Sequence, residues 1–251
     1  MPDTLNDELI RAAFEAHSSF TAEDLRIFFA EHGEPHLNTN TLISRIYLLK
    51  KRGVIASCGR GSYTIGARPA LQQFLLDEDE PFINIIADKL PHIRFAVWEY
   101  SAAAKLANVQ VAQNFLFAEA DKEACESVFG LVRQLRRDVF LDPDELVLAR
   151  YASMYERPVI IKPLISEAPL ELMKGRTLPS LEKLCVDPLS EPRYFPELKG
   201  QAYRTMVKSF FAENVINRNT LRRYAARRGM LPRLEEILHS LNLSLRLPGE
   251  A

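Results

Sequence analysis

The stretch NTLISRIYLLKKRGVIASCGRGSYTI, residues 40–65, carries the clearest structural pattern in the 251-residue chain. Its first half predicts a helix from about residue 40 to 52, because Leu42, Ile46 and Leu49 recur at helical spacing and would face a core together. Its second half predicts two short strands, 54–57 and 62–65. They are joined by a tight Gly-Arg-Gly turn, in which glycine tolerates a positive φ.

Two more helices are expected ahead of this stretch. The first covers about residues 5–17. The second begins at Thr21, a residue suited to an N-cap, and stops near Gly33, which suits a C-terminal cap. The order helix, helix, turn, helix and hairpin is the plan of a winged helix-turn-helix domain, which we place in residues 1–69.

A winged helix-turn-helix domain binds double-stranded DNA by placing the start of its last helix in the major groove. Asparagine pairs with adenine and arginine with guanine, whereas lysine contacts phosphate. These rules select the candidate DNA-binding residues Asn38, Asn40, Thr41, Ser44, Arg45, Lys50, Lys51 and, at the hairpin tip, Arg60. Domains of this plan also serve as protein–protein modules, and that alternative stays open.

The formal net charge of -1 conceals a strong local asymmetry. Residues 35–76 contain six basic and no acidic side chains, and residues 199–233 contain nine basic side chains and one acidic one. Each of the other segments is net acidic. The first basic segment coincides with the predicted recognition helix and hairpin, as expected for a surface that meets phosphate.

Strands alternate with helices after about residue 70. Strands are expected near residues 94–100, 114–120, 138–141 and 158–165, and an amphipathic helix near 123–135. From about Pro179 onward the pattern is helical again. The expected fold is therefore mixed α/β (α+β). The winged helix-turn-helix domain is followed, in residues 70–251, by an α/β domain with a helical C-terminal part.

The second basic segment contains a helix whose arginines form a candidate second basic surface: Arg218, Arg222, Arg223 and Arg227. One interpretation is a nucleic-acid contact. Another is a docking face for an acidic partner or for the acidic middle segment of this chain. The third is a solvated helix whose arginine stems cover apolar surface.

Signals for enzymatic chemistry are weak. The chain has no GxSxG, P-loop or Rossmann glycine pattern, so we predict no cofactor and no catalytic activity. Glu119, Asp121 and Lys162 near strand ends leave a metal-dependent nuclease as a weak alternative, although the usual acid-x-lysine pair on one strand is missing. The His and Glu residues at 31–36 are interrupted by Gly33 and Pro35, and we predict no metal site there.

The cysteines Cys58, Cys125 and Cys185 are odd in number and far apart, which fits neither a disulfide framework nor a zinc site. The first residues lack the hydrophobic core of a signal peptide, and no window approaches about 18 consecutive apolar residues. These features predict a cytoplasmic protein without a membrane partner.

Several motifs together resemble the AbiEi-type antitoxins, over about residues 8–230. In the first domain the similarity lies in residues 44–55 and 59–63. Further along it lies in Val97-Trp98-Glu99-Tyr100, Phe117-Ala118-Glu119-Ala120, Lys162–Leu170, Pro179–Asp187 and Leu221–Ala225. The string Leu-Glu-Lys-Leu-x-Val-Asp at 181–187 is the most specific piece. Family strands that often read Val-Glu-Val-Glu are here Ala118-Glu119-Ala120-Asp121.

This resemblance implies an antitoxin of a bacterial toxin–antitoxin and phage-defence (abortive-infection) module. Its winged helix would repress the module's own promoter at inverted repeats, and its C-terminal domain would counteract a nucleotidyltransferase toxin. The alternative is a stand-alone winged-helix transcription factor whose α/β domain senses a ligand or a partner. Metal-dependent cleavage is the weaker third reading.

Overall fold

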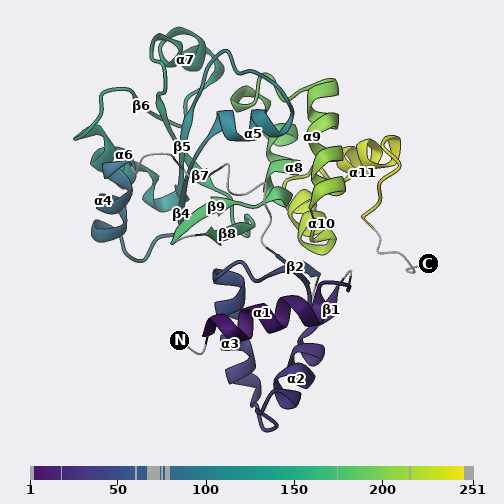
Figure 1. Ribbon diagram of the computed structural model, residues 1–251. Coiled ribbons are helices and arrows are strands. Elements are labelled where there is room, and N and C mark those ends of the chain that lie inside the picture. The colour runs from purple at the N-terminus through teal and green to yellow at the C-terminus, as the bar shows by residue number, and fades with distance from the viewer. Residues whose placement is uncertain are drawn as a thin grey trace.

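The structure of the protein is a computed structural model that describes residues 3–17, 19–59, 61–66, 74, 76, 80–173, 175–214 and 216–245. It has the mixed α/β fold that the sequence predicts. The N-terminal elements lie together on one side of a larger α/β body, and the last helices lie at one end of that body (Figure 1).

The N-terminal part contains the predicted helices and hairpin. Its helices are α1 (Asp3–Phe14), α2 (Ala22–Glu31) and α3 (Thr39–Lys51). Its strands β1 (Phe20–Thr21), β2 (Ile55–Gly59) and β3 (Ser62–Ile65) form one antiparallel sheet in the order β1-β3-β2. Thr21 caps α2 as predicted, in a capping box with Asp24.

The apolar side chains of this part form a core of their own. It includes Ile10 of α1, Phe28 of α2 and Ile46 of α3, and every buried member lies between residues 10 and 55. Leu42, Ile46 and Leu49 face this core, as their spacing predicts. The boundary placed near residue 70 lies where the chain passes from this core to the next ones, and it stays a prediction.

The second part is built on a four-stranded mixed sheet in the order β4-β5-β7-β6. Its strands are β4 (Phe95–Glu99), β5 (Leu116–Asp121), β6 (Val139–Leu141) and β7 (Val159–Leu164). The strand β4 is antiparallel to β5, whereas β5, β7 and β6 are parallel. All four strands lie within two residues of the ranges expected from the sequence.

Both faces of this sheet are covered, so successive residues of a strand enter different cores. Leu116 and Ala118 pack with α4 (Pro81–Lys89) and α6 (Cys125–Arg133). Phe117 faces the other way, toward the C-terminal helices. The same alternation places the side chains of Glu119 and Lys162 on the face of Phe117.

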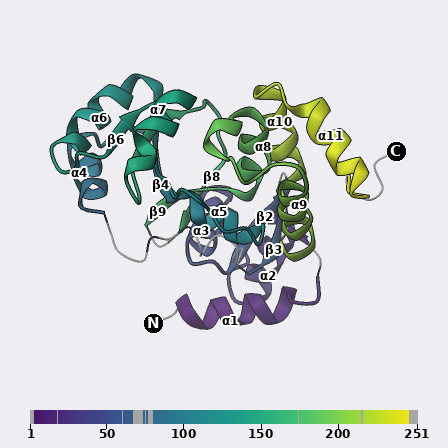
Figure 2. The same ribbon diagram turned by 90° about the horizontal axis from the view of Figure 1, so that it is seen from above.

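The remaining elements cover that second face and the edges of the sheet. The helices are α5 (Tyr100–Leu106), α7 (Glu145–Arg150), α8 (Leu181–Ser190), α9 (Gly200–Glu213), α10 (Arg218–Arg227) and α11 (Leu231–Ser240). Short 3-10 turns lie at Lys122–Ala124, Ala152–Met154 and Pro192–Tyr194. Figure 2 shows α9, α10 and α11 together at the end of the body opposite α4 and α6.

Helix α7 and the hairpin of β8 (Leu170–Met173) and β9 (Arg176–Pro179) were not predicted from the sequence. Both are short, and neither has enough residues for a clear apolar period. In the part of the chain that the structure describes, no helix is both long and apolar enough to cross a membrane.

Candidate DNA interface and a buried ion network

The start of α3 is stabilised by two of the predicted DNA-binding residues. The Oδ1 atom of Asn38 accepts hydrogen bonds from the backbone N–H of Thr41, at 2.8 Å, and from its hydroxyl, at 3.0 Å. Asn38 is therefore the N-cap of α3. The prediction that these two side chains read bases stays open, but each already has a partner within the protein.

One face of α3 is open to solvent along its whole length. Asn40, Ser44, Tyr47 and Lys51 follow one another at helical spacing, and all four are exposed. Lys50 and Ile43 lie at the edge of the same face, and 59% of Ile43 and 55% of Tyr47 is exposed. This face has hydrogen-bonding groups, two lysines and no acidic side chain.

Sequence reasoning overlooked Ile43 and Tyr47 as surface residues. The signal was present, because the core positions Leu42, Ile46 and Leu49 leave 43 and 47 on the outside of the helix. An apolar side chain in the major groove can contact the methyl group of thymine, so Ile43 fits this surface.

Arg45 is placed differently from the other predicted contacts. It lies beside Ile46, at the side of α3 that faces α2, and its guanidinium is 2.5 Å from the carboxylate of Glu34. The same guanidinium lies 4.8 Å from the centre of the Phe29 ring. A base contact by Arg45 would require this ion pair to open, so Arg45 serves first to hold α2 and α3 together.

The hairpin that follows α3 lies against the second part of the molecule. Strand β2 contacts α10, and Figure 1 shows it next to the lower end of that helix. Gly61 adopts a φ of +69°, as the predicted tight turn requires. Arg60 at the tip lies outside the described residues.

Helix α10 and its C-cap residue Arg228 use basic side chains within the protein. Arg223 lies 3.6 Å from the carboxylate of Glu167, Arg227 donates to the hydroxyl of Ser166, and Arg228 lies 3.1 Å from the carboxylate of Glu191. These contacts support the interpretation that the second basic segment docks on the acidic middle of the chain. Arg222 is exposed beside them.

A network of buried charges joins β5, β7, α8 and α10. The ammonium of Lys183 lies 2.7 Å from the carboxylate of Glu119 and 2.5 Å from that of Asp187. Each of these three side chains is 1% exposed. Tyr224 donates to Asp187 at 2.7 Å, and the indole N–H of Trp98 donates to Glu119 at 2.9 Å.

A second arm of the network begins at Lys162. Glu119 and Lys162 are register partners on the parallel strands β5 and β7, with 3.8 Å between the charged atoms. Lys162 also lies 2.5 Å from the carboxylate of Glu191, which pairs in turn with Arg228. Three cations therefore balance three anions in a nearly closed environment, and each has a partner of opposite charge.

The network shifts the pKa values of its members. Burial by itself would raise the pKa of Asp187, but Lys183, Lys162 and Arg228 together hold it below its ordinary value. Burial would likewise lower the pKa of Lys162, but the carboxylates of Glu119 and Glu191 raise it above its ordinary value. The geometry thus keeps both groups ionised.

This arrangement argues against the nuclease alternative. The structure does bring Glu119 and Lys162 together, but the position where a cation would meet Glu119 and Asp187 is taken by the ammonium of Lys183. Asp121 lies apart from this cluster and pairs with Arg94 at the end of β5. Among the described residues no group of three or more His, Cys, Asp and Glu side chains is arranged to hold a metal ion.

The chain matches the model of a known protein family. The profile of a family of unknown function (DUF6577) matches residues 41–244. The chain belongs to this family. No curated protein matches the chain.

The DUF6577 match includes most of α3, the hairpin, the four-stranded sheet and all the C-terminal helices. It begins at Thr41, so α1 and α2 lie before it. The exposed face of α3 beyond Asn40 and the entire buried ion network fall within the region that defines the DUF6577 family. The matched region therefore includes most of α3 and the α/β part, and does not include α1 and α2.

Proposed function

We propose that this protein is a DNA-binding transcriptional regulator that contacts double-stranded DNA with α3. The observation that carries the proposal is the exposed face of α3, where Asn40, Ser44, Tyr47 and Lys51 are aligned without an acidic neighbour. A helix presented in this way, next to a two-stranded hairpin, has the shape and the charge that enter a major groove.

The residues of this face divide by expected role. Asn40 and Ser44, near the start of the helix, have the hydrogen-bonding groups that read base edges. Lys50 and Lys51, in the last turn, supply the charge that binds phosphate without reading sequence. Changes in the first pair should therefore affect specificity, and changes in the second should affect salt dependence.

The test uses the full chain and duplexes selected from a random pool, together with the region upstream of its own gene. The double variant Asn40→Ala/Ser44→Ala should lose about 1–3 kcal/mol per base contact on the selected duplex and little on random DNA. Lys51→Ala should weaken both and lower the salt slope by about 0.9.

Lys89→Ala is the matched control, because Lys89 is an exposed lysine in the last turn of α4, in the other part of the molecule. It should bind like the wild type. The proposal is wrong if no duplex is preferred over random DNA, or if the α3 variants bind as tightly as the control.

We further propose that the regulator is an antitoxin of the AbiEi type, which represses its own promoter and counteracts a nucleotidyltransferase toxin. The resemblance in residues 44–63 and 162–187 supports this finer assignment. The side chains of its most specific string, Glu182, Lys183 and Asp187, are each 1% exposed. They hold the fold, so a toxin would have to be counteracted through other surfaces of the domain.

Co-expression with a toxin tests the antitoxin assignment separately from the DNA-binding proposal. The full chain should rescue cells from the nucleotidyltransferase encoded beside its gene, and the α3 double variant should rescue equally while losing repression. Failure to rescue, or a neighbouring gene for an unrelated protein, would remove the antitoxin assignment and leave the regulator.

A further inference from the structure

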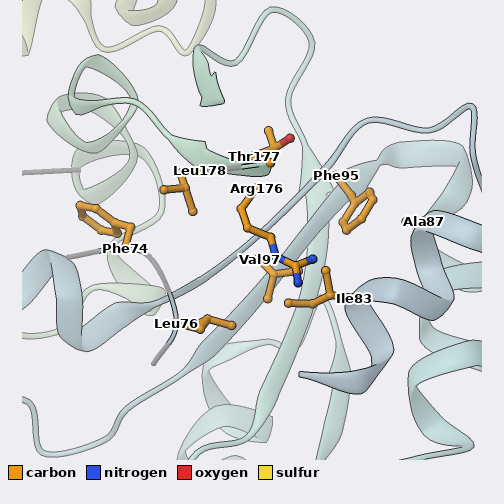
Figure 3. A pocket seen from close by; sticks show the side chains of 10 residues that line it. Phe74, Leu76, Ile83, Ala87, Phe95, Val97, Arg176, Thr177 and Leu178 are labelled. Atoms are coloured by element: carbon orange, nitrogen blue, oxygen red, sulfur yellow. The ribbon is translucent and has the colours of Figure 1, made fainter. Parts of the chain in front are cut away.

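A cavity of about 190 Å³ lies between α4, β4 and β9. Its inner wall is made by the buried side chains of Phe74, Ile83, Val97 and Leu178. Figure 3 shows these side chains around the space, with Arg176 reaching from β9 toward Val97 and Ile83. None of the residues that line the cavity belongs to α3 or to the buried ion network, and the proposed DNA contact does not use it.

The sheet topology explains why space remains here. Strand β4 is at the edge of the four-stranded sheet, and β9 of the two-stranded hairpin lies near it. Helix α4 covers β4 from one side only, so the wall between α4 and β9 stays incomplete. Ala87 of α4 is an exposed residue of the lining and has a small side chain.

The size of the cavity limits its occupant. An apolar cavity of about 150 Å³ is large enough to take up benzene. A cavity of about 190 Å³ therefore accommodates one aromatic ring with one small substituent. The rings of Phe74 and Phe95 line this space, and aromatic rings pack favourably on one another in edge or offset arrangements.

The polar side chains of the lining indicate which substituent the aromatic ring of a ligand would carry. Arg176 and Thr177 are the charged and the hydroxyl-bearing residues among the lining side chains. Arg176 makes a long hydrogen bond of 3.5 Å to Asn84. A guanidinium has five N–H donors in a planar fork, a geometry that binds a carboxylate through two parallel hydrogen bonds.

We propose that this cavity is a binding site for a monocyclic aromatic carboxylic acid, with the ring against Phe74 and Val97 and the carboxylate on Arg176. The site does not depend on the DNA-binding proposal. The site also supports the alternative of a ligand-sensing regulator. Phe74, which would contact the ligand, lies in the sequence between the hairpin and α4.

The experiment titrates the purified full chain with benzoate and, separately, with the uncharged benzyl alcohol of similar size, by calorimetry and by two-dimensional NMR. Benzoate should bind saturably, and about tenfold or more tightly than benzyl alcohol, as expected for a charge-assisted hydrogen bond. Arg176→Gln should reduce benzoate to the level of benzyl alcohol.

A variant at an exposed position of the lining tests the location of the site without disturbing the core. Ala87→Trp places a large side chain on an exposed position of α4 and should abolish benzoate binding, whereas Lys89→Trp, exposed on the same helix but outside the lining, should not. The proposal is overturned if the wild type shows no saturable binding of benzoate, or if Ala87→Trp binds it unchanged. Equal affinity for benzoate and benzyl alcohol would overturn the carboxylate assignment.

Discussion

At the scale of single residues, two side chains at α3 that are suited to DNA contact also have structural roles. Asn38 and Arg45 have the chemistry of base readers, and the sequence alone favours that role for both. In the folded protein Asn38 caps α3 and Arg45 pairs with Glu34. A loss of DNA binding in either variant therefore has two possible origins, which a second substitution separates.

Asn38→Ala should lower the free energy of unfolding by about 1 kcal/mol, because the backbone N–H of Thr41 loses its acceptor. Asn38→Ser keeps a capping oxygen and should restore stability, as measured by urea denaturation. If the cap is the whole role of Asn38, the serine variant also restores affinity for DNA. A stable serine variant that still binds DNA weakly would show that Asn38 reads a base.

Lys183 is the residue on which the buried network most depends. Lys183→Met leaves Glu119 and Asp187 without their shared ammonium and should destabilise the protein by about 3–5 kcal/mol. The matched control is Arg26→Ala, which breaks the ion pair to Glu23 on the surface of α2 and should cost less than about 1 kcal/mol. Equal costs in urea denaturation would contradict the role assigned to the network.

At the scale of elements, α10 joins the two parts of the molecule. It packs on α8 through Tyr224 and Arg228, and strand β2 of the hairpin lies against it. The two basic segments of the sequence are therefore neighbours in space, although more than a hundred residues separate them. The exposed Arg222 of α10 therefore tests whether the proposed DNA interface extends beyond the N-terminal part.

Arg222→Ala should lower the slope of log affinity against log salt by about 0.9, since each neutralised phosphate of a duplex contributes about that amount. The measurement is a salt titration of the selected duplex. Arg233→Ala, which removes an exposed arginine of α11, is the control and should leave the slope unchanged. An unchanged slope in the Arg222 variant would confine the DNA interface to the N-terminal part.

At the scale of the whole molecule, stability should depend on pH at both extremes. The folded-state pKa of Asp187 is lowered from an ordinary value of 3.8, mainly by Lys183 acting against the effect of burial. Its stabilisation is complete above that value and is lost as the pH falls through the folded pKa, because the unfolded chain then binds more protons.

The loss of stability at alkaline pH is expected from Lys162, whose pKa is shifted in the opposite direction to that of Asp187. Its pKa is raised from an ordinary value of 10.5 because the carboxylates of Glu119 and Glu191 outweigh the effect of burial. This stabilisation is complete below that value and is lost as the pH rises through the folded pKa. Urea denaturation over a pH series should show a plateau with both limits. Asp187→Asn should flatten the acid limit, whereas the exposed control Asp88→Asn should retain it.

The sequence by itself determined the parts of this protein that depend on short-range order. Helical spacing located α3 and its core positions, the glycine turn located the hairpin, and Thr21 began α2. These signals are local because the period of a helix or a strand repeats within a few residues. For the same reason the mixed α/β fold and the four strands of the main sheet were predictable.

Only the tertiary structure decided which charged residues meet. Glu119, Lys162 and Lys183 are each separated by more than 20 residues, and no local pattern relates them. The parallel register of β5 and β7 and the docking of α8 bring them together. The packing of α3 on α2 turned Arg45 toward Glu34, and long-range packing placed α10 beside the hairpin. Contacts between distant segments depend on register and packing, which the period of a single segment does not encode.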